Sequence, residues 1–94
     1  MSRNDQHEER EAVMGVIRIL SKRGDDRWSW NAQDALAGDA EAQAAVREAE
    51  RIFARELSKG STAFRVEAGK TVERLERFDP ETSEIIVVPR VVGG

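Results

Sequence analysis

The sequence predicts a small α+β domain in which two N-terminal helices pack on one face of a C-terminal antiparallel β-meander. Three stretches lead to this prediction: an apolar stripe at helical spacing within residues 5–23, an alanine-rich segment over residues 40–58, and the β-branched run Ile85–Val88. The chain has 94 residues, which is the length of one domain, so we take residues 1–94 as a single unit.

The first predicted helix covers residues 5–23. Its stripe places apolar side chains at i, i+3, i+4 and i+7, namely Val13, Val16, Ile17 and Leu20. Asp5 and Glu8 have the spacing of a capping box, and Gly24 stands where a helix commonly ends. A strand over VMGVIRIL is the alternative, because Gly15 and the β-branched residues lower helix propensity. The stripe and the two end signals favour the helix.

Trp28 and Trp30 lie in the predicted connector after this helix. Side chains two residues apart share a face when the backbone is extended. We expect the two rings to fill the gap between the helices, because tryptophan carries a large apolar surface. The alternative is an exposed aromatic patch that binds a partner.

The second predicted helix covers residues 40–58. Asn31 is expected to cap a short helical turn over residues 32–37, and Asp39 to cap the long helix that follows. Lys59 and Gly60 then end it. The buried stripe is expected to consist of Ala42, Ala45, Val46, Ala49, Ile52, Phe53 and Leu57.

The predicted meander covers residues 62–88, followed by an extended tail over residues 89–94. A tight turn at Gly69 and a type I turn at Asp79-Pro80 separate three strands. The middle strand, residues 71–78, has a helix as its alternative because its apolar residues are spaced by three. Pro89 cannot donate a hydrogen bond to a ladder, so the last strand stops there or lies at the edge of the sheet.

Composition excludes several classes of function. The net charge is −3 with 35% charged residues, which argues against a nucleic-acid-binding surface. Cysteine is absent, His7 is the only histidine, and the carboxylates fall on predicted solvated faces. We therefore expect no enzymatic activity, no cofactor and no metal site. The charged start MSRNDQHEER is unlike a secretory signal and no stretch is long enough to span a membrane, so a cytoplasmic protein is expected.

The chain closes with Val88-Pro89-Arg90-Val91-Val92-Gly93-Gly94. This stretch resembles the tails of ubiquitin-like and sulfur-carrier proteins, which end in Gly-Gly after an extended apolar or basic run. The resemblance implies that an adenylating enzyme activates the carboxylate of Gly94 and grips Arg90, Val91, Val92 and Gly93. Glycine suits a tail threaded through a narrow tunnel, because it has no side-chain bulk. Those families have a β-grasp fold that runs strand, strand, helix, strand, strand, whereas the predicted elements here include no opening hairpin.

A protein-interaction subunit is the alternative function. The run Ile85–Val92 is rich in β-branched residues, and an edge strand of this kind can add to a partner's sheet. Pro89 and Arg90 would then guard the strand against self-association. The Trp28/Trp30 patch is the second surface on which this function could depend.

Overall fold

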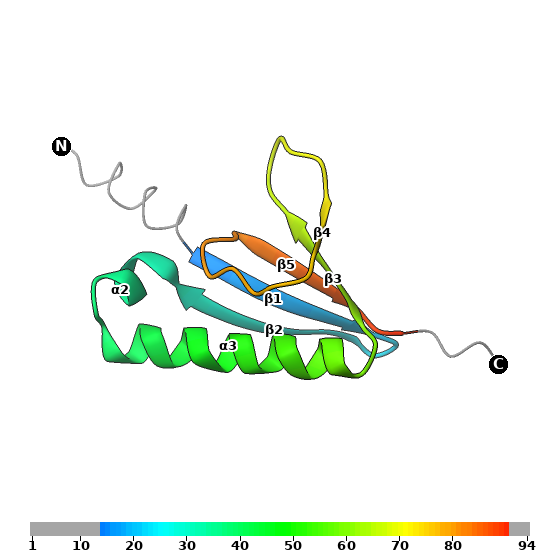
Figure 1. Ribbon diagram of the computed structural model, residues 1–94, viewed down its shortest axis with the longest axis horizontal. Helices are drawn as coiled ribbons and strands as arrows, with labels where there is room; N and C mark the ends of the chain where they lie inside the picture. The colour runs from blue at the N-terminus through cyan, green and yellow to red at the C-terminus, as the bar shows by residue number, and fades with distance from the viewer. Residues whose placement is uncertain (1–13, 91–94) are drawn as a thin grey trace.

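The computed structural model describes residues 14–90, which form a five-stranded sheet with one long helix across one of its faces (Figure 1). The elements in chain order are β1 (Met14–Ser21), β2 (Gly24–Asn31), α2 (Ala32–Leu36), α3 (Ala40–Ser58), β3 (Thr62–Val66), β4 (Glu73–Leu75) and β5 (Glu84–Val88). The α+β class is as predicted, but the arrangement of two N-terminal helices before a meander is wrong. Two strands come first, and the helices follow them.

The sheet is mixed, with the strand order β2-β1-β5-β3-β4. β5 runs parallel to β1 and antiparallel to β3, and the other neighbours pair antiparallel. The predicted antiparallel meander is therefore wrong, because β5 crosses over to lie between β1 and β3 instead of pairing with β4. The prediction of an edge position for Ile85–Val88 is also wrong, since this strand is the third of the five.

The hairpin β1–β2 replaces the predicted helix 5–23 and the connector after it; residues 5–13 of that helix lie outside the described residues. Ile17 and Ile19 face α3, while Val16 and Arg18 face the opposite side of the sheet. The side chains therefore alternate between the two faces, as they do in a strand. Helical spacing and strand alternation both fit these residues, and β-branched side chains favour the strand. Gly24, with a φ of 126°, completes the hairpin turn instead of ending a helix.

Asn31 and Asp39 cap the two helices of the described chain, as predicted. The side chain of Asn31 accepts a hydrogen bond from the N–H of Asp34 (2.8 Å) at the start of α2. The side chain of Asp39 accepts one from the N–H of Ala42 (2.8 Å), and α3 then covers Ala40–Ser58, the predicted range. β4 is shorter than the predicted strand 71–78 and contains only Glu73–Leu75.

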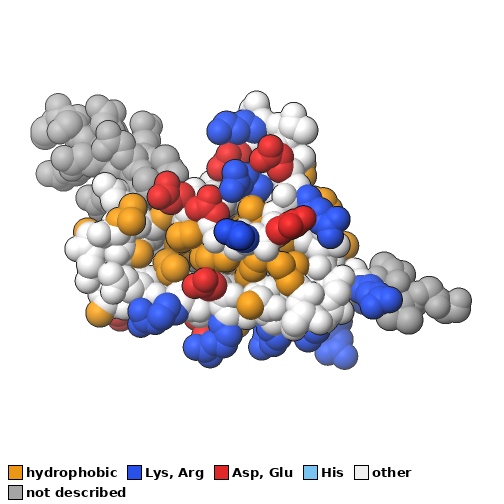
Figure 2. All heavy atoms as spheres, viewed as in Figure 1, with side chains coloured by type: hydrophobic (Ala, Val, Ile, Leu, Met, Phe, Trp, Pro, Cys, Tyr) orange, Lys and Arg blue, Asp and Glu red, His pale blue; other side chains and the backbone are white. Residues whose placement is uncertain are grey.

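The core lies between α3 and the sheet. Its buried members are Ile17, Trp30, Ala32, Ala49, Ile52, Phe53, Ala63, Leu75, Ile85 and Val87. Phe78, in the loop between β4 and β5, packs on the rings of Trp30 (centroids 5.3 Å apart) and Phe53 (5.9 Å). Figure 2 shows hydrophobic side chains gathered in the seam between α3 and this loop, with Lys and Arg side chains along the outer margin of α3.

Candidate functional site

The candidate site begins where β5 ends, at the segment Val88–Arg90, which we call the tail root. The strand stops at Val88 because Pro89 has no N–H to continue the ladder. Of the predicted site residues, Val91, Val92, Gly93 and Gly94 lie outside the described residues. Only the tail root can therefore be described.

Arg90 is exposed, and its aliphatic stem lies over Gly60, just after α3. A β-carbon placed on Gly60 would lie 3.0 Å from Cδ of Arg90, and Gly60 has a φ of 95°. The glycine thus serves both the turn out of α3 and the close approach of Arg90. This contact joins the tail root to the start of β3.

The tail root lies at a basic end of the molecule. Because β1 and β5 are parallel, the turn Lys22-Arg23 is at the same end of the sheet as Val88. Thr62 pairs with Val88, which brings Lys59 to this end as well. All four cations, Lys22, Arg23, Lys59 and Arg90, are exposed. Lys59 is partly neutralised by Glu56, whose carboxylate lies 3.3 Å from its Nζ.

The face of the sheet opposite α3 has no helix over it in the described chain, and we call it the open face. It carries a band of apolar side chains from the three central strands, namely Val16, Phe64, Val66, Ile86 and Val88. Most are partly exposed, and Val88 has 36% of its surface exposed. Because Val88 belongs both to this band and to the tail root, the open face reaches the tail root.

A cluster of charges lies beside the apolar band. Arg18 donates hydrogen bonds to Asp25 (2.8 Å) and Glu84 (2.8 Å), which joins β2, β1 and β5. Arg27 approaches Asp25 at 3.3 Å. The hydrogen bond from Arg18 lowers the pKa of the Asp25 carboxyl, and the bonds to Glu84 and then Asp25 raise the pKa of Arg18. These charges pair with one another and so link the three strands β2, β1 and β5.

The two tryptophans of β2 share a face, but they do not form a patch. Trp30 is 2% exposed, and its indole N–H donates to the carbonyl of Pro80 at 2.8 Å. Gly15 lies against the same ring. Trp28 is 42% exposed and is the only member of the predicted patch that a partner could reach.

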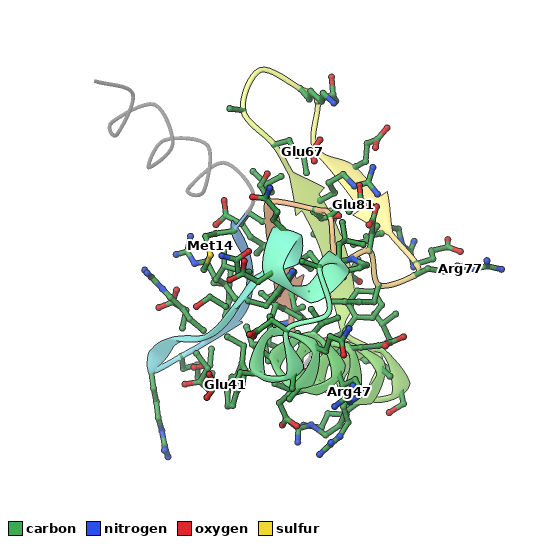
Figure 3. All side chains as sticks on the ribbon, turned by 90° about the vertical axis from the view of Figure 1, so that its left-hand side faces the viewer. Met14, Glu41, Arg47, Glu67, Arg77 and Glu81 are labelled. Atoms are coloured by element: carbon green, nitrogen blue, oxygen red, sulfur yellow. The ribbon has the colours of Figure 1, made fainter. Side chains whose placement is uncertain are left out.

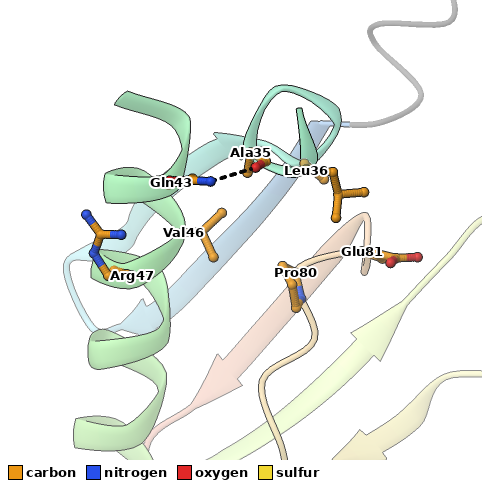
Figure 4. A pocket seen from close by; sticks show the side chains of 8 residues that line it. Ala35, Leu36, Gln43, Val46, Arg47, Pro80 and Glu81 are labelled. Carbon is orange, nitrogen blue, oxygen red and sulfur yellow. Dashed lines mark hydrogen bonds between the residues drawn. The ribbon is translucent and has the colours of Figure 1, made fainter. Parts of the chain in front are cut away.

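A small apolar pocket lies at the other end of α3, between α2 and the loop before β5 (Figure 4). Ala35, Leu36, Val46 and Pro80 form most of its wall, and Gln43 closes one side by donating to the carbonyl of Ala35 (3.1 Å). Its volume of about 290 Å³ lies just below the range of roughly 300–1,000 Å³ that is usual for small-molecule sites. The pocket is therefore at the lower limit of size for a small-molecule site.

Within residues 14–90 no group of three or more His, Cys, Asp or Glu side chains is placed to hold a metal ion. None of the described helices has the length and apolar character needed to cross a membrane. Comparison with known proteins finds no family model, no curated protein and no solved structure that matches this chain. Function is therefore inferred from the residues and their arrangement.

The sequence-based interpretation missed the open face and the exposed edge of β2. The signal for the open face was the alternation of Val16, Arg18 and Leu20 with the buried Ile17 and the partly buried Ile19. The apolar stripe at helical spacing obscured it. The signal for the edge was weaker, since strand order depends on contacts between residues far apart in the chain.

Proposed function

We propose that this protein is a small carrier or protein modifier that acts through the carboxylate of Gly94, after an adenylating enzyme has activated it. The observation that carries the proposal is the position of the tail root, which follows the central strand β5 beside an apolar face that no other element within residues 14–90 covers. A partner that holds the open face is thereby in contact with the root of the tail.

The order of elements supports the same proposal. Within residues 14–90 the hairpin β1–β2 is followed by the short helix α2, the long helix α3, and the strands β3 and β5, with the three-residue strand β4 between them. Strand, strand, helix, strand, strand is the order of the β-grasp proteins that the tail resembles. The hairpin that the sequence-based prediction lacked is thus present in the fold, and its place before the helix supports the proposal.

The basic end suggests how the adenylating enzyme would recognise this protein. Lys22, Arg23 and Arg90 surround the tail root with positive charge, so the mouth of the enzyme's tunnel should carry carboxylates. In the activation step an oxygen of the Gly94 carboxylate attacks the α-phosphorus of ATP, and pyrophosphate leaves. The described residues contain no group that would perform this step, which falls to the enzyme.

ATP–pyrophosphate exchange with candidate adenylating enzymes from the same genome tests the proposal. The intact mass of the protein from its native cells first establishes whether Gly94 is the residue that bears the free carboxylate. Exchange should depend on the carrier and should be lost when Gly93 and Gly94 are deleted. A protein whose cellular activity is unchanged by that deletion does not act through its tail.

The alternative function, an interaction subunit, was expected to bind through the last strand or through a patch formed by Trp28 and Trp30. β5 is central and cannot accept a partner strand, and Trp30 is buried. Trp28 remains exposed, on an edge strand that the sequence did not identify.

A further inference from the structure

The outer edge of β2 is an exposed strand edge. Among residues 14–90 no strand pairs with this edge, whereas the other edge strand, β4, has only the three residues Glu73–Leu75. Figure 3 shows that the β1–β2 hairpin extends past α3 on the flank where Glu41 lies, so the helix does not cover the edge. Edges of this length are commonly protected by a bulge, a proline or charged side chains; β2 has no bulge and no proline, and its charged residues, Asp25–Arg27, lie in its first half only.

Only alternate residues of β2 can bond to a further strand. Ser21 and Gly24 flank the two-residue turn and pair with each other, so Gly24, Asp26, Trp28 and Trp30 direct their backbone groups toward β1. The intervening residues direct their N–H and C=O groups outward, namely Asp25, Arg27, Ser29 and Asn31. A strand added antiparallel to this edge would bond to these four residues.

We propose that the partner is a second copy of this chain, bound antiparallel through β2 with Trp28 facing Trp28 of the second copy. Two registers give the longest symmetric overlap, one pairing Gly24–Trp30 and the other pairing Asp25–Asn31. The first places Arg27 directly opposite Arg27, and like charges in that position destabilise a pair of strands. The second places the two Trp28 rings opposite each other at the symmetry axis, and no like charges face each other.

Three features of the second register favour association. Trp28 is exposed in the single chain, and an aromatic pair is favourable beyond the area that it buries. Arg27 pairs opposite the uncharged Ser29, and Asp25 opposite the uncharged Asn31. The register also brings the basic turn Lys22-Arg23 of each copy toward the start of α2 in the other copy, where the acidic Asp34 is exposed.

The resulting dimer has a continuous sheet with both α3 helices on the same side. The symmetry axis reverses the direction of the strands, so the two tail roots lie at opposite ends of the dimer. The dimer contact leaves both open faces free of the other copy's described residues, so dimer formation is compatible with the proposed carrier function but does not depend on it. A pairing of this size belongs with weak, concentration-dependent interfaces.

Sedimentation velocity of the full chain, from about 10 µM to about 1 mM, measures the association. We expect a reversible dimer, and Trp28→Lys should raise its dissociation constant about tenfold or more by placing two like charges at the axis. Val72→Lys is the matched control, because Val72 is also exposed but precedes the opposite edge strand, and it should leave the dimer unchanged. Circular dichroism verifies that both variants fold.

Cysteine substitution reads the register directly, since the chain contains no cysteine of its own. In an antiparallel pair of strands, two directly opposite residues that do not hydrogen-bond to each other have Cα atoms about 4.5 Å apart, and a disulfide can span that distance. The two Trp28 positions form such a pair in the proposed register. Trp28→Cys should therefore form a disulfide-linked dimer under mild oxidation faster than Arg27→Cys. A monomer at every concentration, a dimer that Trp28→Lys leaves intact, or faster crosslinking at position 27 would each overturn the proposal.

Discussion

Gly15 has no side chain because the ring of Trp30 occupies the space where a side chain would lie. A β-carbon on Gly15 would be 2.3 Å from Cε2 of Trp30, so Gly15→Ala must displace the ring. Trp30 is buried, and displacement also strains its hydrogen bond to the carbonyl of Pro80 (2.8 Å). Overpacking a core costs about 1–3 kcal/mol and a lost hydrogen bond about 0.5–1.5 kcal/mol. We expect Gly15→Ala to lower the free energy of unfolding by about 2–4 kcal/mol.

Such a loss is a large part of the roughly 5–15 kcal/mol that stabilises a domain, and it should lower the melting temperature by roughly 10–25 °C. Urea unfolding followed by tryptophan fluorescence measures it. The matched control is Ser29→Ala, on the exposed side of the neighbouring strand. Because the cost of Gly15→Ala arises from the contact with the ring of Trp30, that cost should be smaller in a chain that also carries Trp30→Phe. The free-energy changes of the two substitutions will therefore not add. A cost below about 0.5 kcal/mol for Gly15→Ala would show that Trp30 does not pack on Gly15 in this way.

Three further outcomes can be measured. Asp39→Ala removes the cap of α3 and should cost about 0.5–2 kcal/mol in urea unfolding, with an unchanged m-value. The pKa of Asp25 is lowered in the folded state, so the stability that its carboxylate contributes is present above the unfolded pKa and is lost as the pH falls below about 4. The urea midpoint should therefore fall less steeply between about pH 5 and pH 2 for Asp25→Asn than for the unchanged protein. Equal slopes would contradict this. Val88→Asp should leave the fold intact and reduce pyrophosphate exchange about tenfold, whereas Val72→Asp should not, and equal rates would remove the open face from the recognition surface.

Local signals in the sequence predict α2 and α3, although similar signals within residues 5–23 wrongly predict a helix where β1 lies. Asn31 and Asp39 cap α2 and α3 because the chemistry of a helix start involves residues three apart, which the sequence shows directly. The same is true of Pro89, which ends β5 through its own missing N–H. These features depend on neighbours in the chain and need no knowledge of the fold.

The central position of β5 and the hairpin β1–β2 could not be predicted from neighbouring residues in the sequence. Both depend on pairing between residues far apart, such as Ile17 with Ile85. The apolar residues in Met14–Ser21 suit a helix or a strand, and the partner strand decides between them. The sequence names the tail residues and Trp28 as candidates for the site, and these stay predictions. Trp30 is buried because it packs on Gly15 and donates a hydrogen bond to Pro80, and these contacts join residues far apart in the chain.

The central position of β5 has a consequence for how the protein acquires its structure during synthesis. The hairpin β1–β2 and the pair β3–β4 make no ladder with each other, and only β5 joins them into one sheet. This strand is also the last of the five to leave the ribosome, so the sheet cannot close until almost all of the described chain has emerged. Long-range pairing of this kind slows folding, because the loop between β1 and β5 must close first. A chain released before residue 84 would therefore contain two strand pairs with no strand to join them, and we expect it to be prone to aggregation and to proteolysis.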